Sequence, residues 1–444
     1  MRVAVVGAGI IGVTTAYELG ADGHDVTVYE RRGSVAEETS FANAGLVAPG
    51  YVAPWSAPGM PLKVLRHLSS RHAPVRVHAN LDLGWTWKWW RACQVRTYQA
   101  NRLRMQRLAF FSRDRLQELT RHLHLDYERR QGYLVLLRSP KDLAMVQPGL
   151  APLSALGTRF EIVDAARCRT LEPGLASQTS LHAGIHLPDD EVGNCRQFAL
   201  LLRREAEQAG VRFRFDTAVQ RIEPGATPRL VHLRVTRDET AVSTRAKGDT
   251  GDWPETQPQA AEPVSEVFDA IVVCAALGSP ALLRPLGLKL PLQAVYGYSV
   301  TAPLRHNDQH LDQAPRSALM DERYKVAISR LGSRIRVDGS AELGGSLENH
   351  HPGALATLYK VLDDWFPGAA QTTQAQHWKG ARPMLPDGPP VLGPCGIEGV
   401  WLNLGHGSSG WALACGSARL LAGALAGRPP PIDTEGLGIE RLWA

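Results

Sequence analysis

The sequence predicts a mixed α/β protein with a nucleotide-binding unit at its N-terminus and an antiparallel sheet farther along the chain. Three observations predict this fold. Residues 3–30 read as strand, turn, helix and strand, a second glycine-rich turn lies within residues 400–425, and alternating apolar runs fill residues 290–339. The length of 444 residues indicates two or three domains rather than one.

The first pattern has a specific chemical meaning. A short apolar run, Val3–Val6, stops at Gly7, Gly9 and Gly12, a helical pattern follows, and a second strand closes on Glu30. The first glycine permits a sharp turn, the second lets a pyrophosphate approach the backbone, and the third lets helix and strand pack closely. The helix N-terminus attracts phosphates, and Glu30 can accept hydrogen bonds from a ribose 2′-hydroxyl. A Rossmann-like dinucleotide site is therefore predicted, and a 2′-phosphorylated cofactor is disfavoured.

Composition and charge exclude several classes of protein. The net charge of +5 is modest, and the chain has no basic block interleaved with aromatics, so no nucleic-acid partner is expected. The six cysteines are scattered without metal-ligand spacing, which indicates no metal site and a reduced, intracellular protein. No run has the length and apolarity of a membrane span. A secretory signal is the alternative for the N-terminal run, but its three glycines and the immediate second strand argue against it.

A long connection follows the second strand of this unit. Small residues dominate between Thr39 and Tyr51, above all in Ala42–Gly45. Small side chains let a backbone approach a ligand closely, which favours a loop running along the cofactor over an ordinary surface loop.

Four tryptophans cluster in a predicted helix, at Trp85, Trp87, Trp89 and Trp90. Two interpretations compete: the rings pack in the core, or they form an amphipathic face that lies on a membrane. Large aromatic side chains are usually well buried, so the core is favoured.

Periodicity and cap signals predict the other elements. Asn194 is expected to cap a helix that ends at Gly210, with Gln197 as its reciprocal partner. Residues 61–125 are expected to be helical, and residues 238–263 to form a polar, flexible excursion. Further helices are predicted at 353–366 and 411–425, and strands at 133–137, 182–187, 211–215, 230–235, 268–274, 290–300, 325–329, 334–339 and 400–404.

Two stretches in the last third carry side chains suited to chemistry. Arg382 is followed by Pro383 and Pro386, so we expect it in a stiff turn, where its planar fork can hold a carboxylate. Gly405–Gly410 joins a strand to a helix and offers a second helix N-terminus to an electron-rich group. His406 has two open interpretations, as a turn residue bonded to its neighbours or as part of an active site.

Several motifs spread over the chain form a recognisable set. They are Gly7–Gly12 with Glu30, Thr39–Gly45 with Pro49–Tyr51 and Pro54-Trp55, Gly297–Ser299, Asp321–Lys325, Gly380–Pro383 with Pro386–Gly388, and Gly405–Gly407 with Gly410-Trp411. This set resembles the bacterial FAD-dependent D-amino acid dehydrogenases (small subunit), within the wider D-amino acid oxidase and glycine oxidase family. The sequence departs from the pattern of this family at two places. Tyr296 stands where a Lys is usual, and the excursion at residues 238–263 is longer than usual.

The resemblance implies an enzyme of two domains. Residues 1–50, 182–280 and 381–444 would form the Rossmann-like FAD-binding domain, and residues 51–181 and 281–380 a discontinuous substrate domain built on an antiparallel sheet. Hydride transfer from the α-carbon of a D-amino acid to FAD would give an imino acid, which hydrolyses to a 2-oxo acid and ammonia. Electrons would pass to a quinone or another respiratory acceptor, which implies a cytoplasmic protein or peripheral contact with the cytoplasmic face of the inner membrane.

The resemblance also implies the site residues. Arg382 is expected to bind the substrate carboxylate, with Tyr298 and Tyr324 as helpers and His406 in the active site. The expected FAD contacts are Val6, Gly7, Ala8, Gly9, Ile10, Ile11, Gly12, Glu30, Arg31, Ser40, Asn43, Ala44, Gly45, Leu46, Val219, Ala275, Gly278, Gly407, Ser408, Ser409 and Gly410.

Two other functions stay open on the sequence. One is an oxidase that makes hydrogen peroxide from glycine, sarcosine or another amine, since oxygen reactivity depends on access around the flavin. The other is a non-catalytic dinucleotide-binding sensor, against which Arg382 argues because a sensor needs no preorganised carboxylate clamp. No general base is evident, and hydride transfer needs none if the substrate amine binds in its neutral form.

Overall fold

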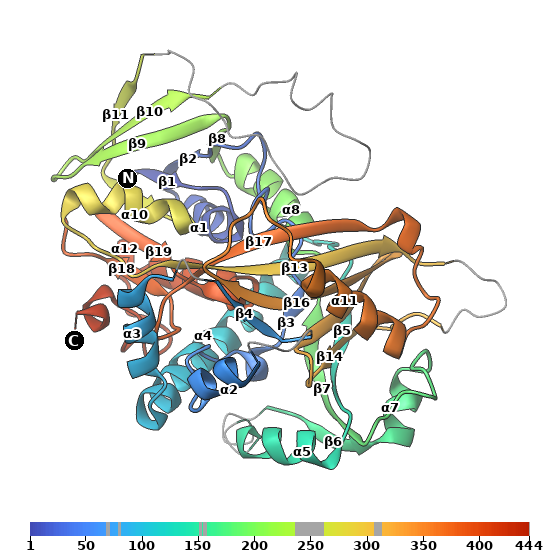
Figure 1. Cartoon of the computed structure of the whole chain (residues 1–444). Helices are drawn as coiled ribbons and strands as arrows, with labels where there is room; N and C mark the ends of the chain where they lie inside the picture. The colour runs from blue at the N-terminus through green and yellow to red at the C-terminus, as the bar shows by residue number, and fades with distance from the viewer. Residues whose placement is uncertain are drawn as a thin grey trace.

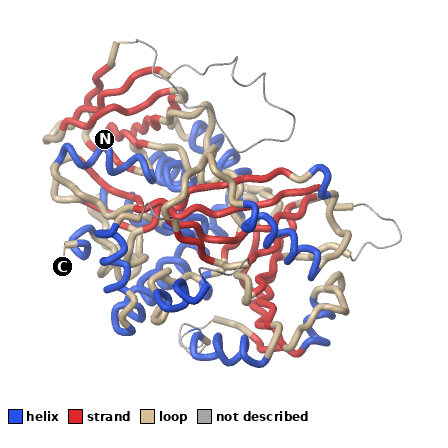
Figure 2. Tube along the Cα trace, in the orientation of Figure 1, coloured by secondary structure: helices blue, strands red, loops and turns tan. Residues whose placement is uncertain are grey.

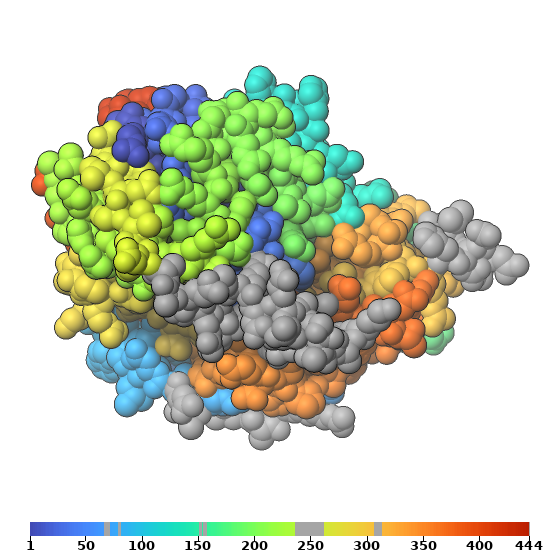
Figure 3. Space-filling view, turned by 90° about the horizontal axis from the view of Figure 1, so that it is seen from above, coloured from blue at the N-terminus to red at the C-terminus, as the bar shows by residue number. Residues whose placement is uncertain are grey.

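The computed structural model contains a parallel sheet and a larger, mostly antiparallel sheet, with helices packed around both (Figures 1 and 2). It describes residues 1–67, 72–78, 81–150, 153, 158–235, 262–305 and 313–443. Most of the predicted excursion at 238–263 therefore lies outside the described residues. In the space-filling view the green and yellow segments of the nucleotide-binding side and the orange segments of the larger sheet occupy different sides (Figure 3).

The parallel sheet confirms the predicted N-terminal unit. Its strand order is β18-β19-β12-β1-β2-β8, and only β18 runs antiparallel to its neighbour. The helices α1 (Ile10–Ala21), α8 (Cys195–Gln208) and α12 (Gly410–Leu425) bury their apolar side chains in one shared core against it. Its strands are β1 (Arg2–Val6), β2 (Asp25–Tyr29), β8 (Arg212–Arg214), β12 (Ala270–Val273), β18 (Val391–Pro394) and β19 (Val400–Leu404).

The larger sheet has ten strands, in the order β17-β13-β16-β15-β14-β5-β7-β3, with β4 on β16 and β6 on β7. The helix α11 (Pro352–Trp365) packs against it with a core that includes Trp365 and Leu358. Its strands are β3 (Leu46–Val47), β4 (Val75–Val77), β5 (Arg130–Leu137), β6 (Glu161–Asp164), β7 (Ala183–Val192), β13 (Gln293–Pro303), β14 (Ala318–Asp321), β15 (Val326–Leu331), β16 (Arg334–Leu343) and β17 (Gln376–Met384). A third sheet joins β9 (Thr217–Glu223), β10 (Arg229–Arg234) and β11 (Val264–Val267).

Three local predictions need correction. Residues 61–125 are not helical throughout, because the strand β4 lies among them and pairs with β16. The helix α2 (Met60–His67) precedes this strand, and the helices α3 (Leu83–Ala92) and α4 (Val95–His122) follow it. The strand predicted at 182–187 continues to Val192, because its pairing with β5 and β3 extends beyond Pro188. Asn194 caps α8 as predicted, but the side chain of Gln197 donates to the carbonyl of Asp126 instead of closing the reciprocal bond. Further short α-helices in the described part of the chain are α5 (Pro140–Val146), α7 (Ala165–Leu171) and α10 (Ser279–Leu283).

The predicted domain boundaries do not follow the sheets everywhere. Strands β3 and β7 belong to the larger sheet, although their residues fall within the segments assigned to the FAD-binding domain. Strand β17 crosses the boundary at residue 381. The division into two domains stays a prediction.

The tryptophan cluster is split between core and surface. Trp85 and Trp89 are 3% and 6% exposed and stack on each other. Trp87 and Trp90 are 57% and 54% exposed and also stack, with ring centroids 5.1 Å apart. The core interpretation is therefore confirmed for one pair only. Among the described helices, none combines the length and the apolar character that crossing a bilayer requires.

Candidate active site

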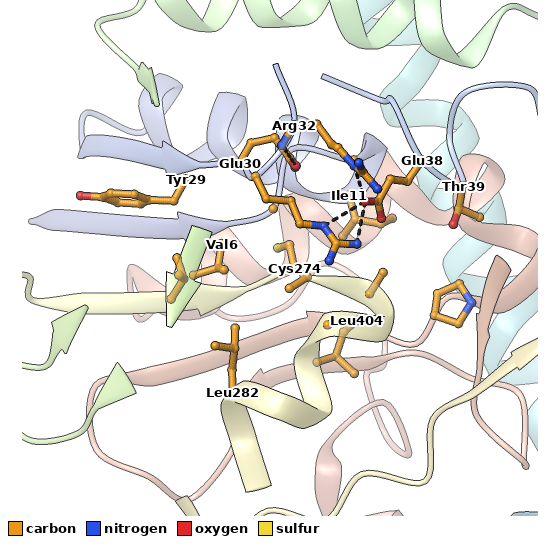
Figure 4. Close-up of a pocket in the computed structure, with 18 of the residues that line it drawn as sticks. Val6, Ile11, Tyr29, Glu30, Arg32, Glu38, Thr39, Cys274, Leu282 and Leu404 are labelled. Atoms are coloured by element: carbon orange, nitrogen blue, oxygen red, sulfur yellow. Dashed lines mark hydrogen bonds and ion pairs between the residues drawn. The ribbon is translucent and has the colours of Figure 1, made fainter. Parts of the chain in front are cut away.

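The first cavity lies over the carboxyl ends of β1 and β2 and measures about 490 Å³ (Figure 4). The glycine turn before α1 forms one wall, and the ends of β12 and β19 with the turns that follow them form another. The first four residues of β9, Thr217 to Gln220, close the side toward the third sheet. A volume in this range suits an organic cofactor, and ligands bind at this edge of open α/β sheets.

The glycines of the turn serve different purposes. Gly7 has φ +100°, and a Cβ there would lie 2.8 Å from the carbonyl oxygen of Cys274. A Cβ on Gly12 would lie 1.8 Å from the carbonyl oxygen of Gly7. A Cβ on Gly9, in contrast, would meet only Ser40 Oγ, at 3.6 Å, and Gly9 lines the cavity. The fold itself requires Gly7 and Gly12, whereas the space beside Gly9 is left for a ligand.

Glu30 joins the end of β2 to the glycine turn. Its carboxylate accepts the backbone N–H groups of Ala8, at 2.6 Å, and Arg32, at 2.8 Å. Burial raises the pKa of Glu30, and these two backbone bonds act in the opposite direction. Glu30 therefore holds the turn in shape in addition to lining the cavity.

A second carboxylate at this cavity was not expected from the sequence. Glu38 accepts hydrogen bonds from Arg31, at 2.6 Å, and from Arg32, at 2.9 Å (Figure 4). Burial alone raises the pKa of Glu38, but the two guanidinium groups outweigh it and lower the pKa. Their pairing needs a loop that folds back on itself, which no local sequence signal indicated.

The second cavity, of about 500 Å³, adjoins the first. Both are lined by Ile10, Thr39, Ser40, Gly407 and Gly410, so one elongated ligand can extend from the first into the second. Its far walls come from the larger sheet, from α2 and from the loop that precedes α2, and include Trp55, Met60, Val64, Met320 and Trp378. Its charged lining residues are Lys63, Lys325, Asp338 and Arg382.

Arg382 lies in the second cavity but not in a turn. It belongs to β17, where it pairs with Val295 of β13. Strand β17 is the edge of its sheet, where Pro383 is tolerated because one side of the strand needs no hydrogen bonds. The guanidinium group of Arg382 occupies space that Gly297 leaves, since a Cβ there would lie 2.1 Å from Nη2. Arg382 Nη1 donates to the carbonyl oxygen of Ser340 at 3.0 Å.

Tyr298 and Tyr324 do not line the cavity that Arg382 faces. Tyr298 follows Gly297 in a strand, so its side chain points to the opposite face of the sheet. There its hydroxyl donates to the carboxylate of Glu342 and accepts the N–H of His351 at 3.0 Å. Tyr296 lies on that same face, under the ammonium group of Lys379 at 4.8 Å, and also stays outside the cavity.

The ring of Tyr324 lies against the guanidinium group of Arg138, 5.1 Å from the ring centroid, and packs near α11. Its neighbour Lys325 enters the cavity instead. Neither predicted tyrosine therefore lines the cavity that contains Arg382, and their role as helpers at the carboxylate has no support in this geometry.

The ring of His406 is bonded within its own strand–turn–helix unit, and its place in the active site stays a prediction. Its ring is buried and Nε2 lies 3.0 Å from the hydroxyl of Ser417. Burial lowers the pKa of His406 to about 3, so the ring is neutral at physiological pH. It contributes to the wall of the first cavity and does not reach the second.

Most of the expected FAD contacts come together. The first cavity is lined by Val6, Gly7, Gly9, Ile10, Ile11, Glu30, Arg31, Ser40, Val219, Ala275, Gly278, Gly407 and Gly410. The second is lined by Asn43, Ala44, Gly45, Leu46 and Ser408. Ala8, Gly12 and Ser409 line neither cavity. The sequence analysis missed Lys63, Asp338 and Trp378, because only the pairing of distant strands and helices brings them to the site.

Comparisons with known proteins agree with this geometry. The model of the family described as "FAD dependent oxidoreductase" matches residues 2–424. A D-amino acid dehydrogenase of Cereibacter sphaeroides is 43% identical over 449 residues, covering 100% of this chain and 96% of that protein. One from Rhizorhabdus wittichii is also 43% identical, over 446 residues, covering 99% of this chain and 100% of that protein.

The chain belongs to this family, among the D-amino acid dehydrogenases. It is an FAD-dependent oxidoreductase, and the open space beside Gly9 together with the two adjoining cavities fits an extended FAD.

Solved structures share the fold. Glycine oxidase from Geobacillus kaustophilus superposes with a TM-score of 0.72 at 18% identity, covering 99% of this chain and 98% of that one. L-proline dehydrogenase from P. horikoshii gives 0.69 at 13% identity, covering 100% of this chain and 97% of that one.

Replacing Gly9 by Val should abolish FAD retention and leave the fold intact, because its side chain points into the ligand space and meets only Ser40 Oγ in the protein. The measurement is the flavin absorbance of the purified variant. As a control, its thermal unfolding should match that of wild-type protein stripped of FAD. A Gly9→Val protein with a full complement of flavin would refute the proposed position of the diphosphate.

Proposed function

We propose that this protein oxidises D-amino acids to 2-oxo acids and ammonia and passes the electrons to a quinone or another respiratory acceptor. The observation that carries the proposal is the guanidinium group of Arg382 in the cavity that adjoins the cofactor cavity. Relatives at 43% identity, matched over nearly their full length, are D-amino acid dehydrogenases, which supports the same substrate class here.

The residues of the second cavity would bind and orient the substrate. Arg382 would hold its carboxylate through two parallel hydrogen bonds, which fixes the face that the α-carbon presents. The carbonyl of Ser340 and the space left by Gly297 keep the guanidinium fork in place before substrate arrives. Trp55, Met60 and Trp378 would surround the substrate side chain and exclude water. When bound, FAD supplies the hydride acceptor.

The exposed part of α3 supports a peripheral contact with the membrane in which a quinone dissolves. Trp87, Trp90 and Leu83 are all more than half exposed, at 57%, 54% and 81%. Lys88 and Arg91 on the same helix are exposed too. Exposed tryptophans beside basic residues favour the interface of an anionic bilayer. We therefore propose that α3 rests on the cytoplasmic surface of the inner membrane.

The whole proposal is tested by the visible spectrum of the purified protein. Anaerobic D-alanine should bleach the flavin band, and L-alanine should not, because only one enantiomer presents its α-hydrogen to the flavin when the carboxylate is fixed. Reoxidation should be fast with a soluble quinone and slow with oxygen. Rapid formation of hydrogen peroxide in air would instead establish an oxidase, and a flavin that no amino acid reduces would end the proposal.

Arg382→Lys should bind FAD normally and lose roughly 10- to 1,000-fold in kcat/KM for D-alanine, since Lys lacks the planar fork. The preference for amino acids over the matching amines should shrink with it. Steady-state kinetics with both substrates measure this. Arg159→Lys, at an exposed ion pair with Asp189, is the matched control and should behave as wild type. Near-normal kcat/KM in Arg382→Lys would remove the arginine from the carboxylate.

Changing both Trp87 and Trp90 to Ser should release the protein from vesicles of anionic phospholipid and leave activity with a soluble dye intact. Co-sedimentation with the vesicles measures the first effect. Trp85→Ala is the contrasting variant, because this ring is buried, and it should lower the free energy of unfolding by about 3–5 kcal/mol. If the double variant sediments with vesicles as wild type does, α3 does not form the membrane contact.

A further inference from the structure

Asp338 is a carboxylate with little exposure to solvent, lies at the proposed substrate cavity and has no part in the proposed function so far. On β16 it pairs with Ser299 of β13, which pairs in turn with Trp378 of β17. Residues paired directly across a sheet point to the same face. Asp338 therefore shares its face with Trp378 and, two and four residues farther along β17, with Gly380 and Arg382. All four line the second cavity.

The carboxylate oxygens of Asp338 can accept further hydrogen bonds. Its side chain is only 12% exposed, and Oδ1 lies 3.5 Å from Arg382 Nη2, which is a loose ion pair. Within the described part of the chain no hydrogen bond to this carboxylate is formed. Buried carboxylates are normally satisfied by donors, so a donor from a ligand in the cavity would complete it. Asp338 is also the one carboxylate among the described lining residues, beside the cations Lys63, Lys325 and Arg382.

We propose that Asp338 binds the α-ammonium group of the substrate while Arg382 binds its carboxylate. An amino acid carries its two opposite charges on groups bonded to one carbon. This matches the guanidinium group of Arg382 on β17 and the carboxylate of Asp338 on β16, which approach to 3.5 Å on one face of the sheet, across the intervening strand β13. The pair thereby selects amino acids over carboxylic acids without an amine. This inference rests on the proposed function.

The charges around Asp338 give the binding a pH dependence. Burial raises the pKa of Asp338 to about 6, against the opposing effects of Arg382 on β17 and Arg336 on β16. Lys63 of α2 and Lys325 of the β14–β15 turn line the same cavity. Above pH 6 the carboxylate is ionised and attracts an ammonium group, and below it the proton removes that attraction. The kcat/KM of wild-type protein for D-alanine should therefore fall as the pH drops through about 6.

A different role for Asp338 would be to orient Arg382 without touching substrate. Two ligands of equal shape separate the roles. 2-Aminoisobutyrate has both charged groups but no α-hydrogen, so it binds without reacting, whereas 2,2-dimethylpropanoate replaces its ammonium group by a methyl group. An ammonium anchor affects only the first ligand, and an orienting residue affects both, because both use Arg382.

The experiment compares the Kd of both ligands for wild-type and Asp338→Asn holoenzyme by calorimetry at pH 8. We expect 2-aminoisobutyrate to bind roughly 10- to 150-fold more weakly to the variant, the range of a hydrogen bond to a charged group. Binding of 2,2-dimethylpropanoate should stay the same or tighten. Asp114→Asn, an exposed acid paired with Arg113, is the control and should change neither.

Other outcomes overturn the inference. Equal weakening of both ligands would reduce Asp338 to a positioning residue for Arg382, and unchanged binding of both would place the ammonium group elsewhere. The wild-type pH profile tests the same point without a variant, so a profile flat between pH 5 and 8 would also contradict it. Failure of the proposed function is separate, because D-alanine would then not bleach the flavin of wild-type protein.

Discussion

The close contact between Gly12 and the carbonyl of Gly7 is the constraint on which the rest of the site depends. Only a hydrogen atom fits there, since a Cβ on Gly12 would lie 1.8 Å from that oxygen. The contact lets α1 begin directly at the end of β1, so its free N–H groups face the first cavity. Ser40 Oγ accepts one of them, from Ile10 at 3.1 Å, and this bond ties the loop after β2 to the same point. The tight turn thus sets both the proposed phosphate position and the start of the loop that leads to the second cavity.

The larger sheet carries one group of charged side chains on each of its two faces, because successive residues of a strand point to opposite faces. On one face Gly297, Asp338 and Arg382 meet the cavity, where the ion pair is loose. On the other face Lys379 lies 2.9 Å from Glu342, which also receives the hydroxyl of Tyr298. These rear charges satisfy one another inside the protein, as buried charges must. The front pair retains unsatisfied capacity, and this difference marks it as the pair that a ligand completes.

Sequence reasoning found what local signals determine. The unit from Gly7 to Glu30, the Asn194 cap and the strand and helix around Gly405 depend on residues close together in the chain. It placed Arg382 in a turn because of Pro383, but pairing with β13, nearly ninety residues away, decided the structure. It chose Tyr298 from a motif, although neighbouring residues of a strand point to opposite faces. No local pattern marked Asp338, because it comes close to Arg382 only when strands distant in the sequence pair in the folded protein.

The loop between the two cavities is fixed from several sides. The carbonyl of Asn43 accepts Arg336 Nη1 at 2.9 Å, and that of Ala44 accepts the hydroxyl of Ser329 at 2.7 Å. The carbonyl of Gly45 accepts Trp411 Nε1 at 3.1 Å. Three consecutive carbonyls are thus held by β16 and β15 of the larger sheet and by α12, which packs against the parallel sheet. Because these bonds use the backbone, the small side chains of the loop leave room for a ligand without loosening it. The distance between the first and second cavities is therefore built into the fold, as the proposed hydride transfer requires.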